Sequence, residues 1–137
     1  KDPLIVYKNS KRGYWYLFML EAILGSTNRE RVLMYLHTQG SGYAREIAAA
    51  FQSAVTPIQK QLLALEEAGV IYCQPQGRTR VYLLNPRYPF LSELEALLNK
   101  ALAHYPPAEQ ERLTPRHHTR RRDDVVSSLN RKTTISF

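Results

Sequence analysis

The stretch that decides the fold covers residues 43–69 and reads YAREIAAAFQSAVTPIQKQLLALEEAG. Apolar residues recur at helical spacing in both of its halves, and small and polar residues separate the two halves. The inward positions are Ile47, Ala48 and Phe51 in the first half and Ile58, Leu62 and Leu65 in the second. The sequence therefore predicts two short helices, 44–51 and 56–68, joined by a tight turn.

The second helix has a clear predicted start. Thr56 and Gln59 form a T-x-x-Q capping box, in which the threonine hydroxyl accepts from the backbone N–H of Gln59 and the glutamine side chain reaches back. Pro57 falls at the first helical position, where its missing N–H costs little. Gly69 follows the last turn and supplies a left-handed stop.

The face of this helix opposite its apolar stripe carries small, amide-bearing and cationic side chains, which suit base edges and phosphates in a DNA major groove. The candidate DNA contacts of the helix pair are Arg45, Ser53, Thr56, Pro57, Gln59 and Lys60. Leu63 lies on the same face. This arrangement is typical of a DNA-reading helix-turn-helix, although helix pairs with a polar face also occur in small domains that bind no DNA.

The segment after the helix pair changes from helical periodicity to alternation. Residues 70–74 and 79–84 are predicted to be strands, with a turn at 75–77, so they form a β-hairpin wing. Arg78 and Arg80 lie two residues apart on one side of this hairpin, where they could reach a minor groove or a row of phosphates. The alternative is that both arginines belong to a solvated edge.

Further helices are expected before and after these elements. A second capping box, Thr27 to Glu30, precedes a helix with an inward stripe of Val32, Leu33 and Leu36, and an apolar helix over 90–104 has Phe90 on its inward side.

The segment 14–24 is apolar nearly all round, which favours burial on more than one side. We expect a dimer interface there, a core helix within a monomer being the alternative. The candidate dimer contacts are Trp15, Leu17, Phe18 and Met19, together with Leu94 and Leu98 of the last helix.

The length and composition of the chain indicate how many domains it can form. The chain has 137 residues and 44 % hydrophobic composition, enough for one domain with extensions. We expect a basic arm over 1–13, a folded domain over 14–104 and a basic, flexible or partner-ordered tail over 105–137.

The net charge of +7 favours a polyanionic partner. The basic run 116–122 is either a phosphate-gripping arm or a soluble end, and the tail is also a candidate docking segment for a protein.

Several classes of protein find no support in the sequence. A single cysteine, Cys73, rules out an intramolecular disulfide framework, and His104, His117 and His118 are expected to be solvated, so no metal site or cofactor is predicted. No catalytic motif or phosphate-binding loop is present, which favours a non-enzyme. The longest apolar run, 14–20, is too short to span a bilayer, and no signal peptide follows it, so we expect a cytoplasmic protein without a membrane partner.

Four segments resemble one superfamily. LGSTNRERVLMYL, REIAAAF, PIQKQLLALEEAGVI and GRTRVYLLN are similar to winged-helix regulators of the arsenical-resistance repressor (ArsR) type and the neighbouring MarR-like families, over residues 20–102. The resemblance implies an α+β, mostly helical fold: a winged helix-turn-helix with a three-helix core, a β-hairpin wing and N- and C-terminal dimerisation helices. The paired cysteines of the metal-sensing members are missing from 44–51, so the non-sensing type is expected.

The resemblance also implies site roles and a function. Thr56, Pro57, Gln59 and Lys60 match base- or phosphate-contacting positions, and the wing positions match at Arg78 and Arg80. We therefore expect a prokaryotic, dimeric, sequence-specific double-stranded DNA binder that regulates transcription as a repressor. The alternative is a winged-helix protein-interaction module, an adaptor or antitoxin-like partner of another protein.

Overall fold

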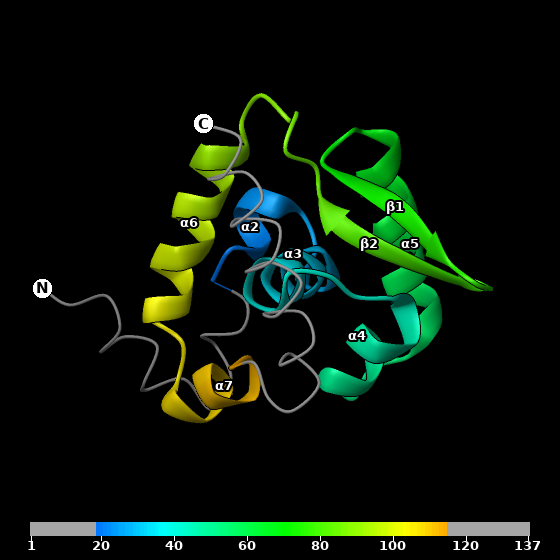
Figure 1. The fold of residues 1–137 in the computed structure, drawn as a ribbon. Helices are drawn as coiled ribbons and strands as arrows, with labels where there is room; N and C mark the ends of the chain where they lie inside the picture. The colour runs from blue at the N-terminus through cyan, green and yellow to red at the C-terminus, as the bar shows by residue number, and fades with distance from the viewer. Residues whose placement is uncertain (1–18, 115–137) are drawn as a thin grey trace, which may run out of the picture.

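The computed structural model describes residues 19–114, which form a mostly helical fold with one small sheet (Figure 1). The helices are α2 (Glu21–Leu24), α3 (Thr27–Gln39), α4 (Ala44–Ala50), α5 (Val55–Glu67), α6 (Leu91–Ala103) and α7 (Pro107–Arg112). The strands β1 (Ile71–Gln76) and β2 (Thr79–Leu84) pair antiparallel. Helices α3, α4 and α5 with this hairpin make a winged helix-turn-helix, so the predicted three-helix core and wing are confirmed.

Some predictions concern parts of the chain that the structure does not describe. The basic arm 1–13, the dimer candidates Trp15, Leu17 and Phe18, and the basic run 116–122 all lie outside the described residues. Met19, the remaining candidate of the first segment, is half-buried and packs against the core.

Helix α3 lies at the centre of the fold, with α6 on one side and α4, α5 and the wing on the other (Figure 1). Its consecutive residues 32–36 are all buried. The predicted stripe of Val32, Leu33 and Leu36 was therefore too narrow, because a helix surrounded by other elements is buried all round. The inward positions predicted for α4 and α5 are buried as expected.

Both predicted capping boxes are wrong. Helix α3 is capped by Ser26, whose hydroxyl accepts from the backbone N–H groups of Asn28 and Arg29 at 3.1 and 3.2 Å. Helix α5 begins at Val55 without a side-chain cap, which makes Pro57 its third residue. The proline is tolerated there because the first four backbone N–H groups of a helix have no partner within it.

The hairpin turn also differs from the prediction. Strand β1 continues through Pro75, which pairs with Arg80, and Gln76 pairs with Thr79. The turn therefore consists of residues 77–78, and Gly77 adopts the positive φ of 62° that such a tight turn requires.

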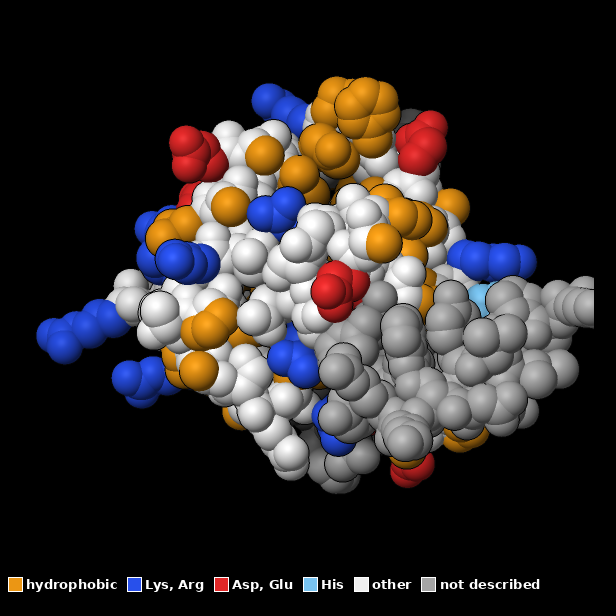
Figure 2. Space-filling view, turned by 180° about the vertical axis from the view of Figure 1, so that it is seen from behind, with side chains coloured by type: hydrophobic (Ala, Val, Ile, Leu, Met, Phe, Trp, Pro, Cys, Tyr) orange, Lys and Arg blue, Asp and Glu red, His pale blue; other side chains and the backbone are white. Residues whose placement is uncertain are grey.

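Helix α6 packs on the core mainly through its second half. Leu98 is fully buried within a single chain, so its assignment to a dimer surface was wrong, whereas Leu94 is half-buried. Phe90 precedes the helix and is 62 % exposed, contrary to its predicted inward place. Hydrophobic side chains gather over the loop between β2 and α6, at the top of Figure 2.

The part of the expected tail nearest the domain belongs to the core. Tyr105 and Leu113 are buried on either side of α7, and the Gln39 side-chain amide donates to the Leu113 carbonyl. Pro107 begins α7 at a position where a missing N–H costs nothing. The boundary predicted at residue 105 was therefore too early.

Glu30 joins three segments of the chain inside this core. Its side chain is fully buried: Oε1 accepts from the backbone N–H of Leu20 at 3.1 Å, and Oε2 accepts from the Tyr105 hydroxyl at 2.5 Å. Burial raises the pKa of Glu30 from 4.5 to about 7, because a carboxylate is poorly solvated there. Burial also raises the pKa of Tyr105, which therefore stays protonated as the donor.

The raised pKa predicts a pH-dependent stability. Between about pH 4.5 and pH 7 the folded chain keeps a proton on Glu30 that the unfolded chain has released. The free energy of unfolding must therefore fall as the pH rises through this interval, by roughly 3 kcal/mol at most. In Glu30→Gln this loss should disappear, as measured by urea unfolding at pH 5 and pH 8. Glu111→Gln, at an exposed position on α7, should keep the wild-type loss, and an identical loss in Glu30→Gln would contradict the assignment.

Candidate nucleic-acid interface

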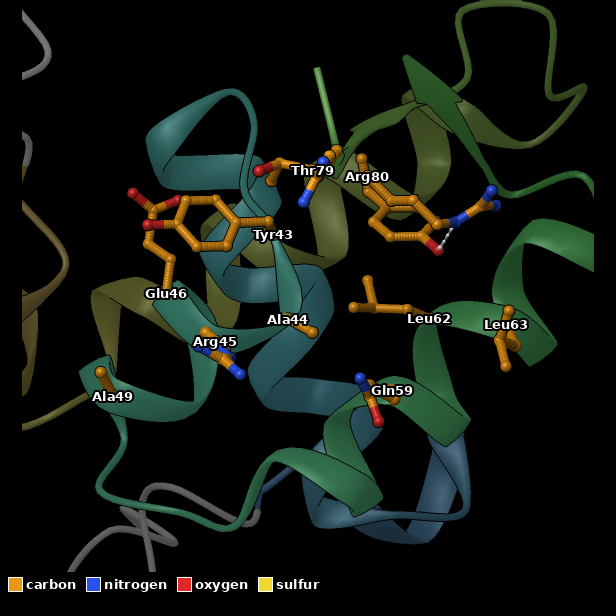
Figure 3. A pocket seen from close by; sticks show the side chains of 12 residues that line it. Tyr43, Ala44, Arg45, Glu46, Ala49, Gln59, Leu62, Leu63, Thr79 and Arg80 are labelled. Carbon is orange, nitrogen blue, oxygen red and sulfur yellow. Dashed lines mark hydrogen bonds between the residues drawn. The ribbon is translucent and has the colours of Figure 1, made fainter. Parts of the chain in front are cut away.

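A groove with a volume of about 860 Å³ lies between α4, α5 and the wing (Figure 3). Arg45 of α4 and Gln59 of α5 lie on one side of it, and Thr79 and Arg80 of the wing lie on the other. The lining residues are Tyr43, Ala44, Arg45, Glu46, Ala49, Gln59, Leu62, Leu63, Arg78, Thr79, Arg80 and Tyr82. The groove thus brings together candidates from both predicted parts of the site, the helix pair and the hairpin.

Helix α5 presents a polar face beside this groove because its apolar stripe is used in the core. Ile58, Leu62 and Leu65 are buried. The predicted contacts Thr56, Gln59 and Lys60 are exposed, as is Leu63, and the spacing of three to four residues places these four side chains on one face. Pro57 and Ser53 are half-buried, and the Ser53 hydroxyl donates to the carbonyl of Ala54.

Exposed cations surround this face. Arg45 on α4, Lys60 on α5 and Arg78 at the wing turn are all exposed, and none of them forms an ion pair within residues 19–114. Lysine and arginine side chains project from the edge of the molecule where α5 and the wing lie, at the left of Figure 2. Such cations are available to phosphate groups.

Arg80 differs from Arg78 because it is engaged within the chain. Its Nη2 atom donates to both carboxylate oxygens of Glu66 at 3.0 and 3.2 Å, and its Nε atom donates to the Tyr82 hydroxyl at 3.0 Å. The hydrogen bond with Tyr82 raises the pKa of Arg80, and the guanidinium carbon lies 5.6 Å from the centre of the Tyr82 ring. Arg80 therefore ties the wing to the end of α5, a role that sequence reasoning missed.

The base of the wing is fixed to the helices on two sides. Gly42, just before α4, exchanges backbone hydrogen bonds of 3.1 and 2.8 Å with Tyr82 of β2. Asn85 closes the hairpin, since its side-chain amide donates to the carbonyl of Gly69 at 2.8 Å and its backbone N–H donates to Val70 at 2.9 Å. The wing and the helix-turn-helix thus keep a defined relation across the groove.

The described residues contain little that points to other chemistry. Within residues 19–114 no group of three His, Cys, Asp or Glu side chains could hold a metal ion. Cys73 is a free, half-buried thiol on β1. None of the helices in this range has the length and apolar character needed to cross a membrane.

Comparison with known proteins gives similarities of structure. No family model matches the sequence, and no curated protein matches it either. Solved structures similar to this one include the YusO protein from Bacillus subtilis, which is 17 % identical over 85 % of this chain and 82 % of that chain, with a TM-score of 0.48. Apo ZitR from Lactococcus lactis is 19 % identical over 85 % of this chain and 89 % of that chain, also at 0.48.

MepR, a transcription regulator of the Staphylococcus aureus multidrug efflux pump MepA, is 17 % identical over 93 % of this chain and 94 % of that chain, with a TM-score of 0.48. The membership of the ArsR or MarR-like families expected from the sequence stays a prediction.

The close packing of Gly42 against Tyr35 predicts that a larger side chain at position 42 lowers the stability of the fold. A Cβ atom at this position would lie 2.7 Å from Cε1 of the buried Tyr35 ring, so Gly42→Ala must displace the ring or the wing. We expect a loss of about 1–3 kcal/mol in the free energy of unfolding, as for other overpacked sites. Urea unfolding measures it, and an unchanged midpoint would contradict the described packing.

Proposed function

We propose that this protein is a sequence-specific double-stranded DNA-binding regulator of transcription that acts as a repressor. The observation that supports this most strongly is the exposed polar face of α5, with the cations Arg45, Lys60 and Arg78 beside it. A helix of this kind fits a major groove, and cations on its two sides fit the phosphates that border the groove.

The residues have different proposed roles. Gln59 is a base contact, because its amide can form paired hydrogen bonds with adenine. Lys60, Arg45 and Arg78 bind phosphates, and Thr56 and Ser53 assist at the start of α5. The wing lies over the adjacent backbone or minor groove, since its turn carries Arg78 beyond the end of the sheet.

We further propose that two copies bind a pseudo-palindromic site with their α5 helices about 34–36 Å apart. The exposed Ile23 of α2, at 69 %, and the exposed Phe90 before α6 give the flanking helices apolar surface that a second copy can cover. Duplexes selected from a random library test both claims, because a dimer selects a symmetric consensus. Failure of every duplex to bind at about 50 mM salt, where phosphate contacts are strong, would instead favour a protein-interaction module.

A phosphate contact at the wing turn predicts a change in salt dependence. Arg78→Ala should weaken binding to all duplexes. It should also lower the magnitude of the slope of log K against log salt concentration by about 1 for each Arg78 lost from the complex. Fluorescence anisotropy over a salt series measures the slope. Lys100→Ala, an exposed cation on α6, should leave it unchanged. Equal slopes in the wild type and Arg78→Ala would remove Arg78 from the interface.

The ion pair between Glu66 and Arg80 predicts an opposite effect for an acidic residue. Glu66→Gln leaves Arg80 without its carboxylate partner, so this arginine becomes available to phosphate, and the salt slope should steepen by up to about 1 for each site. Glu111→Gln on α7 removes the same charge far from the wing and should have no such effect. An unchanged or shallower slope in Glu66→Gln would show that Arg80 does not approach the DNA.

A further inference from the structure

Leu63 is an apolar side chain in the middle of the polar face of α5. It is 55 % exposed, whereas its neighbour Leu62 is 1 % exposed and Leu65 is 6 % exposed. The core therefore makes little use of Leu63. An exposed leucine by itself needs no explanation, but this one lies four residues after Gln59, on the same face and beside the same groove.

The residues around Leu63 indicate the chemistry of the ligand that it contacts. The groove that it lines also carries Arg45 and Arg78, which are cations without an ion partner in the described part of the chain. A ligand that satisfies both features is anionic at its borders and has an apolar group between them. Duplex DNA has this pattern in its major groove, where phosphates flank the base edges and the C5-methyl group of thymine is the exposed apolar group.

We propose that Leu63 contacts the methyl group of a thymine within two base pairs of the base that Gln59 binds, so that it selects a T·A pair at that position. Four residues advance a helix by about 6 Å, and successive base pairs are about 3.4 Å apart, so the two side chains reach neighbouring positions of one half-site. This inference depends on the proposed function, because it assigns a specificity to the same surface.

Deoxyuridine provides a direct test because it differs from thymidine only by the missing methyl group. The full chain is first used to select duplexes from a random library, and each thymine of the selected half-site is then replaced by deoxyuridine in turn. At one position, wild-type binding should weaken about fourfold, the effect of one buried methyl group. Leu63→Ala should bind the thymine and deoxyuridine duplexes equally well at that position while keeping the wild-type salt slope. Fluorescence anisotropy measures both quantities.

The control is Lys100→Ala, which shortens another exposed side chain, on α6 and outside the lining of the groove. It should keep the wild-type difference between thymine and deoxyuridine. If the wild-type protein binds the thymine and deoxyuridine duplexes equally well at every position, the inference is overturned, while the proposal of DNA binding still stands. A difference that persists in Leu63→Ala would assign the methyl contact to another residue and overturn it as well. If no duplex is selected at all, the proposed function itself fails, and the inference fails with it.

Discussion

The burial of α3 on every side is the constraint on which the rest of the structure depends. A helix whose residues 32–36 all leave water must be surrounded, and α2, α4, α5, α6 and β2 pack around it. Helix α5 uses its whole apolar stripe for this purpose. Its opposite face is therefore left in water and can be polar without loss of stability, which makes a helix available for recognition on a rigid support.

The same packing explains the distribution of charge. Glu30 is buried in the core at the cost of a raised pKa, and in return it joins the chain before α2 to the chain after α6. Arg80 is used to hold the wing against the end of α5. Arg45, Lys60 and Arg78 form no ion pair in the described range, and all three lie around the exposed face of α5. Arg80 thus maintains the structure, whereas Arg45, Lys60 and Arg78 remain available to a partner.

Periodicity predicted the elements and the buried faces well, because the spacing of residues such as Ile58 and Leu62 reflects the packing of a single helix. The chemistry of single residues predicted helix caps and turns less well, because neighbouring residues can often fill the same position. Ser26 and Thr27 can both cap α3, and the structure uses Ser26, while Glu30, which a capping box at Thr27 would need, is used in the core. Pro75 suggested a turn, yet a two-stranded sheet tolerates a proline because neither strand has neighbours on both sides.

Contacts between residues that are far apart in the chain could not be predicted from the sequence. Glu66 and Arg80 are fourteen positions apart and meet only when the wing folds against α5. Tyr105 and Leu113 were assigned to a tail because Pro106, Pro107, Pro115 and a basic run follow residue 105, and their burial depends on α3 and α7. The candidate surface on α5 could thus be predicted from its own residues, whereas the groove beside it could not.

The central claim is that α5 and the wing together form the surface that binds duplex DNA. Hydrogen exchange of backbone amides, followed by mass spectrometry with and without a selected duplex, tests it most directly. Binding should slow the exchange of residues 52–64 and 76–80 and leave α7 unchanged. Exchange that slows only in α6 and α7, with no change in α5 or the wing turn, would contradict the claim and place the interface on the opposite side of the domain.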